Sequence, residues 1–294
     1  MDADQLRAEV RDFLVTRRGR ITPAEAGLPV YGGLRRVPGL RREELAMLAG
    51  LSSEYYARLE RGNLRGVSES VLESLSRALR LTEAERAHLY DLARAANSGS
   101  GGRRTAVPQQ VRPGVQRILD AMTAPALVSN ARMDYLAANQ LGRALYAPLF
   151  DSPVGVNAAR FLLLDPRGAE FYPEWDRAVD DVVALLRAQT ARTPWDKVIS
   201  DLVGELATRS EVFRARWARH DVRQHLTGTK RLHHPVVGDL DLRYETMGLP
   251  ADPGLALLLY TAEPASPTAD ALDLLASWSL GSGRTVAAER RVDG

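Results

Sequence analysis

RREELAMLAGLSSEYYARLERG, residues 41–62, is the stretch that decides the fold of the first part of this chain. Its apolar spacing predicts two short helices, and the AGLS segment between them predicts a tight turn. Gly50 supplies the positive φ that such a turn needs, and Ser52 is a suitable N-cap for the second helix. Ala46 is small enough for the two helices to cross closely. This pattern is typical of a helix-turn-helix that binds duplex DNA.

The second of these helices is expected to lie in the major groove and to present polar side chains to the bases. The DNA-binding candidates are Arg41, Arg42, Ser53, Glu54, Tyr55, Arg58 and Arg61. Arg58 suits guanine O6 and N7, Glu54 suits cytosine N4, and Tyr55 suits a thymine methyl group or a phosphate. Arg41 and Arg42 precede or begin the first helix, where they would contact phosphates. The alternative is a helical hairpin inside a bundle that binds no DNA.

Charge is distributed unevenly along the 294 residues. Residues 1–112 carry 19 basic and 14 acidic residues, whereas residues 113–294 carry 20 basic and 23 acidic residues. A basic first part fits a DNA-binding module joined to a domain of another kind. The chain has no cysteine, which excludes disulfides and thiolate chemistry. It shows no signal peptide and no apolar run of the ~18 residues that a membrane span needs, so we expect a cytoplasmic protein without a membrane partner.

The pattern before residue 97 predicts an all-helical domain of five helices, residues 1–97. The expected helices are residues 4–16, the two of the helix-turn-helix, residues 68–79, and one that Thr82 caps and that ends near Ala96. An arginine-rich loop is expected from residue 17 to residue 38. Residues 98–112 are rich in Gly, Ser and Pro and predict a linker.

Residues 113–280 predict a second, α+β domain. Strands are expected at 125–130, 134–138, 230–237, 239–246 and 255–262, with amphipathic helices starting near 175, 195 and 210. Asn139 is expected to cap a further helix. This order predicts an antiparallel sheet with helices packed on one face, as in PAS-type sensor domains. The tail, residues 281–294, is predicted to be disordered.

Large side chains of the second domain are candidates both for its core and for the wall of an effector cavity. They are Phe161, Trp175, Val182, Leu186, Phe213, Trp217 and Tyr244. His220 is a candidate polar anchor for a carboxylate headgroup. Its alternatives are Arg219, Arg223 and Arg231. The histidines from 220 to 234 have poor spacing for a metal, so we expect structural roles for them and no metal site.

Residues 41–62 resemble the XRE, or lambda-repressor-like, family of helix-turn-helix domains, which implies a five-helix domain over about residues 3–96. The longer stretch GLRRVPGLRREELAMLAGLSSEYYARLERG resembles the MmyB-like regulators. FYPEWDRAVDDVVALLRA, FRARWARHDV, GTKRLHHPVVGDLDLRYETM and LLYTAEP extend this resemblance over nearly the whole chain. The resemblance implies an N-terminal XRE domain followed by a PAS-like ligand-binding domain, and a fatty-acid-like effector.

We therefore expect a multidomain, non-enzymatic transcription regulator that binds a double-stranded DNA operator as a homodimer. No resident cofactor is expected besides the small apolar effector. One alternative keeps the DNA reader, while the second domain only dimerises or docks a protein partner. Another is an enzyme tethered to DNA, but the chain has no GxSxG, P-loop or GxGxxG motif.

Overall fold

The structure is a computed structural model, and it describes residues 3–28, 39–97, 110–194, 196–221 and 227–289. The chain forms two compact units. Unit 1 consists of Met1–Ala106, Val183–Gly204 and Arg214–Gln224. Unit 2 consists of Val107–Val182, Glu205–Phe213 and His225–Gly294.

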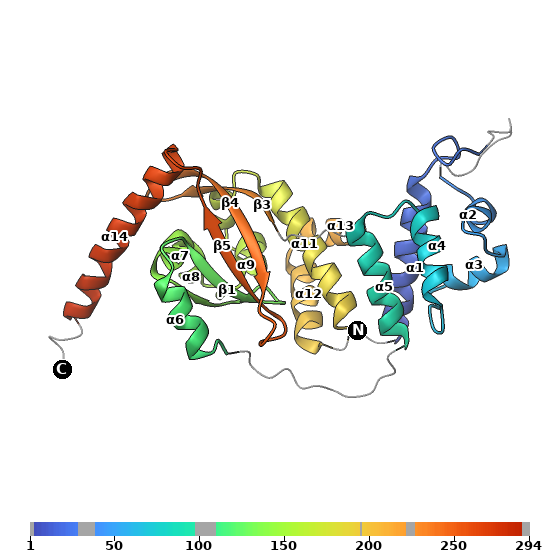
Figure 1. The fold of residues 1–294 in the computed structure, drawn as a ribbon, viewed down its shortest axis with the longest axis horizontal. Helices are drawn as coiled ribbons and strands as arrows, with labels where there is room; N and C mark the ends of the chain where they lie inside the picture. The colour runs from blue at the N-terminus through green and yellow to red at the C-terminus, as the bar shows by residue number, and fades with distance from the viewer. Residues whose placement is uncertain (1–2, 29–38, 98–109, 195, 222–226, 290–294) are drawn as a thin grey trace. The chain divides into compact units, whose positions relative to one another are not determined.

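Within the described residues up to position 97, unit 1 has the five helices that the sequence predicts (Figure 1). They are α1 (Ala3–Arg20), α2 (Arg42–Leu48), α3 (Ser53–Glu60), α4 (Glu69–Ala78) and α5 (Glu83–Asn97). Leucine and aromatic side chains from all five are buried in one core. This core includes Leu6, Phe13, Leu45, Leu59, Leu75 and Leu89.

Capping interactions fix the ends of these helices. The Ser52 hydroxyl accepts a hydrogen bond from the backbone N–H of Tyr55 at 3.1 Å. Gly50 has a φ of 67°, as the predicted turn requires. The backbone N–H of Thr82 donates to the Glu85 carboxylate at 2.9 Å, which is half of a capping box. The predicted helix starts are therefore confirmed at α3 and α5.

The prediction of a loop from residue 17 was wrong for its first residues, because RRGR at 17–20 forms the last turn of α1. The buried Arg17 guanidinium lies 2.8 Å from the Glu85 carboxylate, and Arg18 lies 2.7 Å from the carboxylate of Glu60. Cations are also favoured at a helix C-terminus. Long-range ion pairs therefore extend the helix beyond its predicted end. Residues 29–38 of the predicted loop lie outside the described residues.

Unit 2 contains an antiparallel sheet of five strands within the described residues. Its strands are β1 (Ala126–Asn130), β2 (Tyr135–Ala138), β3 (Thr227–His234), β4 (Gly238–Gly248) and β5 (Leu255–Thr261). Their order across the sheet is β2-β1-β5-β4-β3. Along β4, Leu240, Leu242 and Tyr244 are buried, and the residues that alternate with them are exposed or nearly so. The five predicted strands are present, and the alternation along β4 is confirmed. The strand expected at 230–237 instead lies at Thr227–His234, because residues 235–237, which begin with a proline, form a turn.

The helices that follow α5 differ in the unit to which they belong. Those that belong wholly to unit 2 are α6 (Pro113–Ala121), α7 (Gln140–Leu145), α8 (Ala147–Phe150), α9 (Ala158–Leu164), α10 (Arg167–Phe171) and α14 (Pro267–Glu289). The helices α11 (Trp175–Arg192), α12 (Lys197–Arg209) and α13 (Glu211–Trp217) supply residues to both units. Helix α7 contacts β1 and β2, and α10 contacts β3. In the part of the chain that is described, no helix is long and apolar enough to cross a membrane.

Two helices differ from the prediction. Leu119 of α6 packs with Ala126, Val128 and Leu257, so this unpredicted helix partly covers the second face of the sheet. Helix α14 continues to Glu289 although a disordered tail was predicted from residue 281. The TVAAE segment in its last turns contains residues that tolerate a helix and no proline to stop one.

The Asn139 side chain ties α7 to the sheet. Its Oδ1 accepts hydrogen bonds from the backbone N–H groups of Gly142 at 2.7 Å and Ala126 at 3.0 Å. Its Nδ2 donates to the carbonyl oxygens of Met122 at 3.0 Å and Ala124 at 2.7 Å. The predicted cap is confirmed, and it also joins β1 to the segment that precedes it.

Candidate functional site

Helix α3 presents the predicted base-reading residues on its surface. Ser53, Glu54 and Arg58 are exposed, Tyr55 is partly buried, and Arg61 is the exposed C-cap. The Arg58 guanidinium carbon lies 4.8 Å from the centroid of the Tyr55 ring. This contact restrains the arginine on the same helix face as Glu54, four residues earlier.

The opposite side of α3 packs into the core of unit 1. Tyr56 and Leu59 are fully buried, as are Leu45 and Ala46 of α2 to within 1%. Leu51, in the turn between α2 and α3, is partly buried. The helix that carries the polar row is therefore held rigidly, which base reading requires.

Glu60, which was not predicted as a site residue, is a buried anchor at the end of α3. Its side chain is 2% exposed, and one carboxylate oxygen lies 2.7 Å from Arg18 Nε. The other oxygen pairs with Arg42, and the Tyr56 hydroxyl donates to the carboxylate at 3.4 Å. Burial and the charge of Glu60 raise the pKa of Tyr56 above its ordinary value. The ERG ending of the motif thus contributes an anchor that joins α1, α2 and α3.

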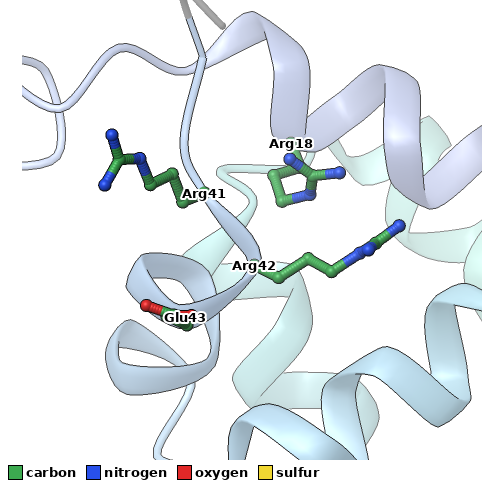
Figure 2. A pocket seen from close by; sticks show the side chains of 4 residues that line it. All are labelled: Arg18, Arg41, Arg42 and Glu43. Atoms are coloured by element: carbon green, nitrogen blue, oxygen red, sulfur yellow. The ribbon is translucent and has the colours of Figure 1, made fainter. Parts of the chain in front are cut away.

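A shallow, open pocket of about 390 Å³ is lined by Arg18, Arg41, Arg42 and Glu43. Figure 2 shows Arg41 and Arg42 leaving the start of α2 in opposite directions. Arg41 is exposed, and its backbone N–H donates to the Glu44 carboxylate at 2.6 Å. Arg42 stays exposed while it pairs with Glu60, which raises the pKa of its guanidinium. A lining with three cations and one acid suits contact with phosphates.

Aromatic rings fill the buried face of the sheet in unit 2. The hydroxyls of Tyr146 and Tyr260 are 2.8 Å apart, and their ring centroids are separated by 5.6 Å. The Phe161 ring, a predicted wall residue, lies 5.7 Å from Phe171 and 6.4 Å from Tyr172. The Tyr146 ring, between α7 and α8, also lies 5.7 Å from Phe171, so these contacts form one cluster of rings.

Lys230 lies at this cluster and was not predicted as a site residue. It stands on β3 opposite Leu242 of β4, so it shares the inward face with the buried β4 residues. Its Nζ lies 5.5 Å from the ring centroid of Tyr244, 5.9 Å from that of Tyr172 and 6.0 Å from that of Tyr260. Burial lowers the pKa of Lys230 to about 8, although the charge of Asp181 opposes this shift.

The predicted ligand-binding residues are divided between the two units. Phe161, Trp175, Val182, Phe213 and Tyr244 belong to unit 2, while Leu186, Trp217 and His220 belong to unit 1. Phe161, Leu186 and Phe213 are fully buried. Trp175 is partly buried, and its indole N–H donates to the carbonyl oxygen of Leu162 at 3.1 Å.

His220 and Trp217 surround a buried arginine of unit 1. Arg187 is 1% exposed, pairs with Glu9, and has Nη1 2.8 Å from His220 Nδ1. Its guanidinium carbon lies 4.2 Å from the Trp217 ring centroid. His88 Nε2 lies 3.7 Å from the Glu9 carboxylate. Burial alone would raise the pKa of Glu9, but His220, His88 and Arg187 together lower it well below its usual value.

The other predicted anchors have separate environments. Arg219 is exposed, Arg231 lies 2.9 Å from the Asp241 carboxylate, and Arg223 is outside the described residues. His233 is an exposed partner of Asp239, whereas buried His234 lies 3.1 Å from a backbone carbonyl oxygen of α7. Among the described residues, no group of three or more acidic or histidine side chains is placed to hold a metal ion.

Two family models match the chain. Residues 17–89 match a helix-turn-helix domain, and residues 111–275 match the ligand-binding domain of MmyB-like transcription regulators. No curated protein matches it significantly. The second match covers more than half of the chain and contains Lys230 and its tyrosines. With a helix-turn-helix before that domain, the chain is a DNA-binding transcription regulator and belongs to the MmyB-like family.

Proposed function

We propose that this regulator binds a palindromic operator as a homodimer, under the control of a fatty-acid-like effector bound in unit 2. The observation that carries the DNA-reading part is the exposed polar row on α3. Glu54 and Arg58 point away from a core that holds Tyr56 and Leu59 fully buried. An acceptor and a forked donor on one rigid helix suit the edges of cytosine and guanine.

The cationic surface beside this helix supports the same proposal. Arg41 and Arg42 line the pocket at the start of α2, where phosphate contacts would set the position of α3 on the duplex. Such contacts supply affinity without sequence information. The base-reading and phosphate-binding roles are therefore assigned to α3 and to the start of α2, respectively.

The aromatic cluster of unit 2 supports an effector that is mainly apolar. Phe161, Phe171 and Tyr260 are buried side chains of the matched ligand-binding region. Apolar walls with a few polar groups are typical of small-molecule sites. The cluster contains phenol hydroxyls and one ammonium group as its polar groups near the rings.

Control by the effector requires that it binds the DNA-competent and DNA-incompetent states with different affinities. Helix α11 offers a physical route for such coupling, because it contributes residues to both units. Asp181, in unit 2, acts electrostatically on Lys230, and Arg187, six residues later, is buried in unit 1 beside Glu9. A displacement of α11 would therefore change the electrostatic environment of both Lys230 and Glu9.

Selection from random duplexes by the full-length chain tests the DNA-reading proposal. We expect a symmetric motif whose half-sites are about 34 Å apart, or a multiple of that spacing. Sedimentation of the selected duplex should show two chains bound to each operator. Recovered duplexes without a common motif, combined with loss of binding at moderate salt, would contradict the proposal.

The second candidate is a regulator whose C-terminal domain only dimerises or docks a protein. Native mass spectrometry of the gently purified chain separates the two functions. A co-purifying lipid-sized mass supports the sensor. The absence of both a co-purifying mass and binding of added fatty acids favours the docking module.

A further inference from the structure

We propose that Lys230 Nζ is the anion anchor of the effector site and that it binds the carboxylate headgroup of an apolar ligand, with the rings of Tyr172, Tyr244 and Tyr260 beside that headgroup. The inference rests on the proposed effector and names the residue that recognises its charge. It replaces His220, which the structure places at Arg187 in unit 1.

The first argument is the environment of the ammonium group. Three tyrosine rings lie within 6.0 Å of Nζ, measured to their centroids. Among the described residues, none forms a hydrogen bond or an ion pair with Lys230, and Asp181 acts on it only through space. Ring faces attract a cation, but they do not satisfy its three N–H donors. Because Lys230 is partly exposed, these N–H donors are accessible to an anionic acceptor.

The second argument is a contrast within the same sheet. Arg231 and Arg243 stand on its exposed face, and each lies within 2.9 Å of an acidic side chain. Lys230 stands on the inward face of β3, beside the aromatic cluster instead. These two exposed cations of the sheet therefore have acidic partners within the chain. Lys230, on the inward face, is available to an acceptor from outside the chain.

The third argument identifies the chemistry of that acceptor. A pKa of about 8 leaves Lys230 mostly protonated at pH 7, so the site attracts an anion and repels a cation. Burial raises the pKa of Tyr244 to about 12, which keeps its phenol neutral beside an anionic group. The surrounding rings favour a ligand with a hydrocarbon body. These three properties together describe a carboxylate on an apolar chain.

The position of Lys230 also gives the ligand headgroup access to the proposed site. Strand β3 is the last strand of the sheet, so it has a neighbouring strand on one side only. Lys230 itself is partly exposed, whereas Tyr260 of the inner strand β5 is fully buried. The headgroup would therefore bind near the sheet edge, and the apolar chain would extend toward the inner rings.

The test compares dodecanoate with dodecan-1-ol, which have equal chain length and differ in charge. Calorimetry on the full-length chain at pH 7 should show that dodecanoate binds wild type more tightly. Lys230→Met should weaken dodecanoate binding about 10–150-fold, the range of a charge-assisted hydrogen bond, and change dodecanol binding little. Lys197→Met is the matched control, because Lys197 is the other lysine and pairs with Asp201 on the surface of α12.

A second measurement uses wild type alone. The chain has only two lysines, so amine labelling at pH 8 can be read for each of them by peptide mass. Dodecanoate should protect Lys230 and leave Lys197 reactive, whereas dodecanol should protect neither as strongly. This readout holds even if the Lys230 variant does not fold.

Three results would overturn the anchor. They are unchanged dodecanoate binding in Lys230→Met, equal affinity of wild type for the acid and the alcohol, and no protection of Lys230. Equal affinity would leave an apolar effector site in place without a charge anchor. Failure of wild type to bind either probe would also remove the proposed effector class, while the duplex selection decides the DNA-reading proposal separately.

Discussion

Gly62 ends the ERG motif, and its replacement by alanine tests whether this residue lets α3 approach α1. Two costs add. Its φ of 92° is one that residues with a Cβ rarely adopt, at a cost of about 1–2 kcal/mol. The added Cβ would lie 2.7 Å from the Cα of Arg7, and relieving such overpacking costs about 1–3 kcal/mol more. We therefore expect Gly62→Ala to lower the free energy of unfolding of unit 1 by about 2–5 kcal/mol.

Gly66→Ala is the matched control for this prediction. Gly66 also has a positive φ, 72°, but a Cβ there would meet nothing within 4 Å. Hydrogen exchange of α1 and α3 peptides in the full-length chain measures both variants on the same helices. Gly66→Ala should cost only the conformational part, about 1–2 kcal/mol. Equal destabilisation by the two substitutions would refute the close approach as the reason for glycine at position 62.

Three further predictions concern buried polar groups. Glu60→Gln should destabilise unit 1 by about 3 kcal/mol in urea unfolding, because it leaves the Arg18 cation without its buried carboxylate. Lowering the pH should also destabilise unit 1, because folding lowers the pKa values of His88 and Glu9. The unfolded chain therefore binds more protons than the folded chain, at His88 below about pH 6.5 and at Glu9 below about pH 4.5. The unfolding midpoint should therefore fall between pH 7 and pH 4, and an unchanged midpoint would contradict this. Asn139→Ala should cost about 2–4 kcal/mol in unit 2, since four hydrogen bonds are lost, and thermal unfolding measures the loss.

Local signals account for most of the fold that could be predicted. Ser52, Thr82 and Asn139 are caps whose partners lie within three residues, so the sequence alone indicates them. The alternation along β4 likewise records which face is buried. The exposure of the proposed base-reading residues of α3 was predictable, because it follows from a single helix and its cap.

Long-range contacts account for what was missed. Arg17 extends α1 through a pair with Glu85, and Arg187 is buried beside Glu9, 178 residues away. No local pattern contains such partners. His220 was expected at a ligand because it is titratable, but its position beside Arg187 depends on packing within unit 1.

The alternation of side chains along β3 could have identified Lys230 from the sequence. The GTKRLHH segment alternates on β3, so Lys230 has the same phase as Leu232 and His234, both buried. A lysine in the inward phase of a strand is unusual enough to mark a functional candidate. The identity of the rings around it still depends on α10, β4 and β5 meeting at one place.

Base reading by α3 is tested most directly by the specificity of Arg58→Ala. The measurement is competition binding of the full-length chain to its selected operator and to a shuffled duplex of equal composition, at one salt concentration. Arg58→Ala should weaken operator binding by about 1–3 kcal/mol, or roughly 5–150-fold, and leave the shuffled duplex nearly unchanged. Arg77→Ala, an exposed arginine of α4, should change neither. Equal weakening on both duplexes would contradict base reading and assign Arg58 to the phosphate backbone.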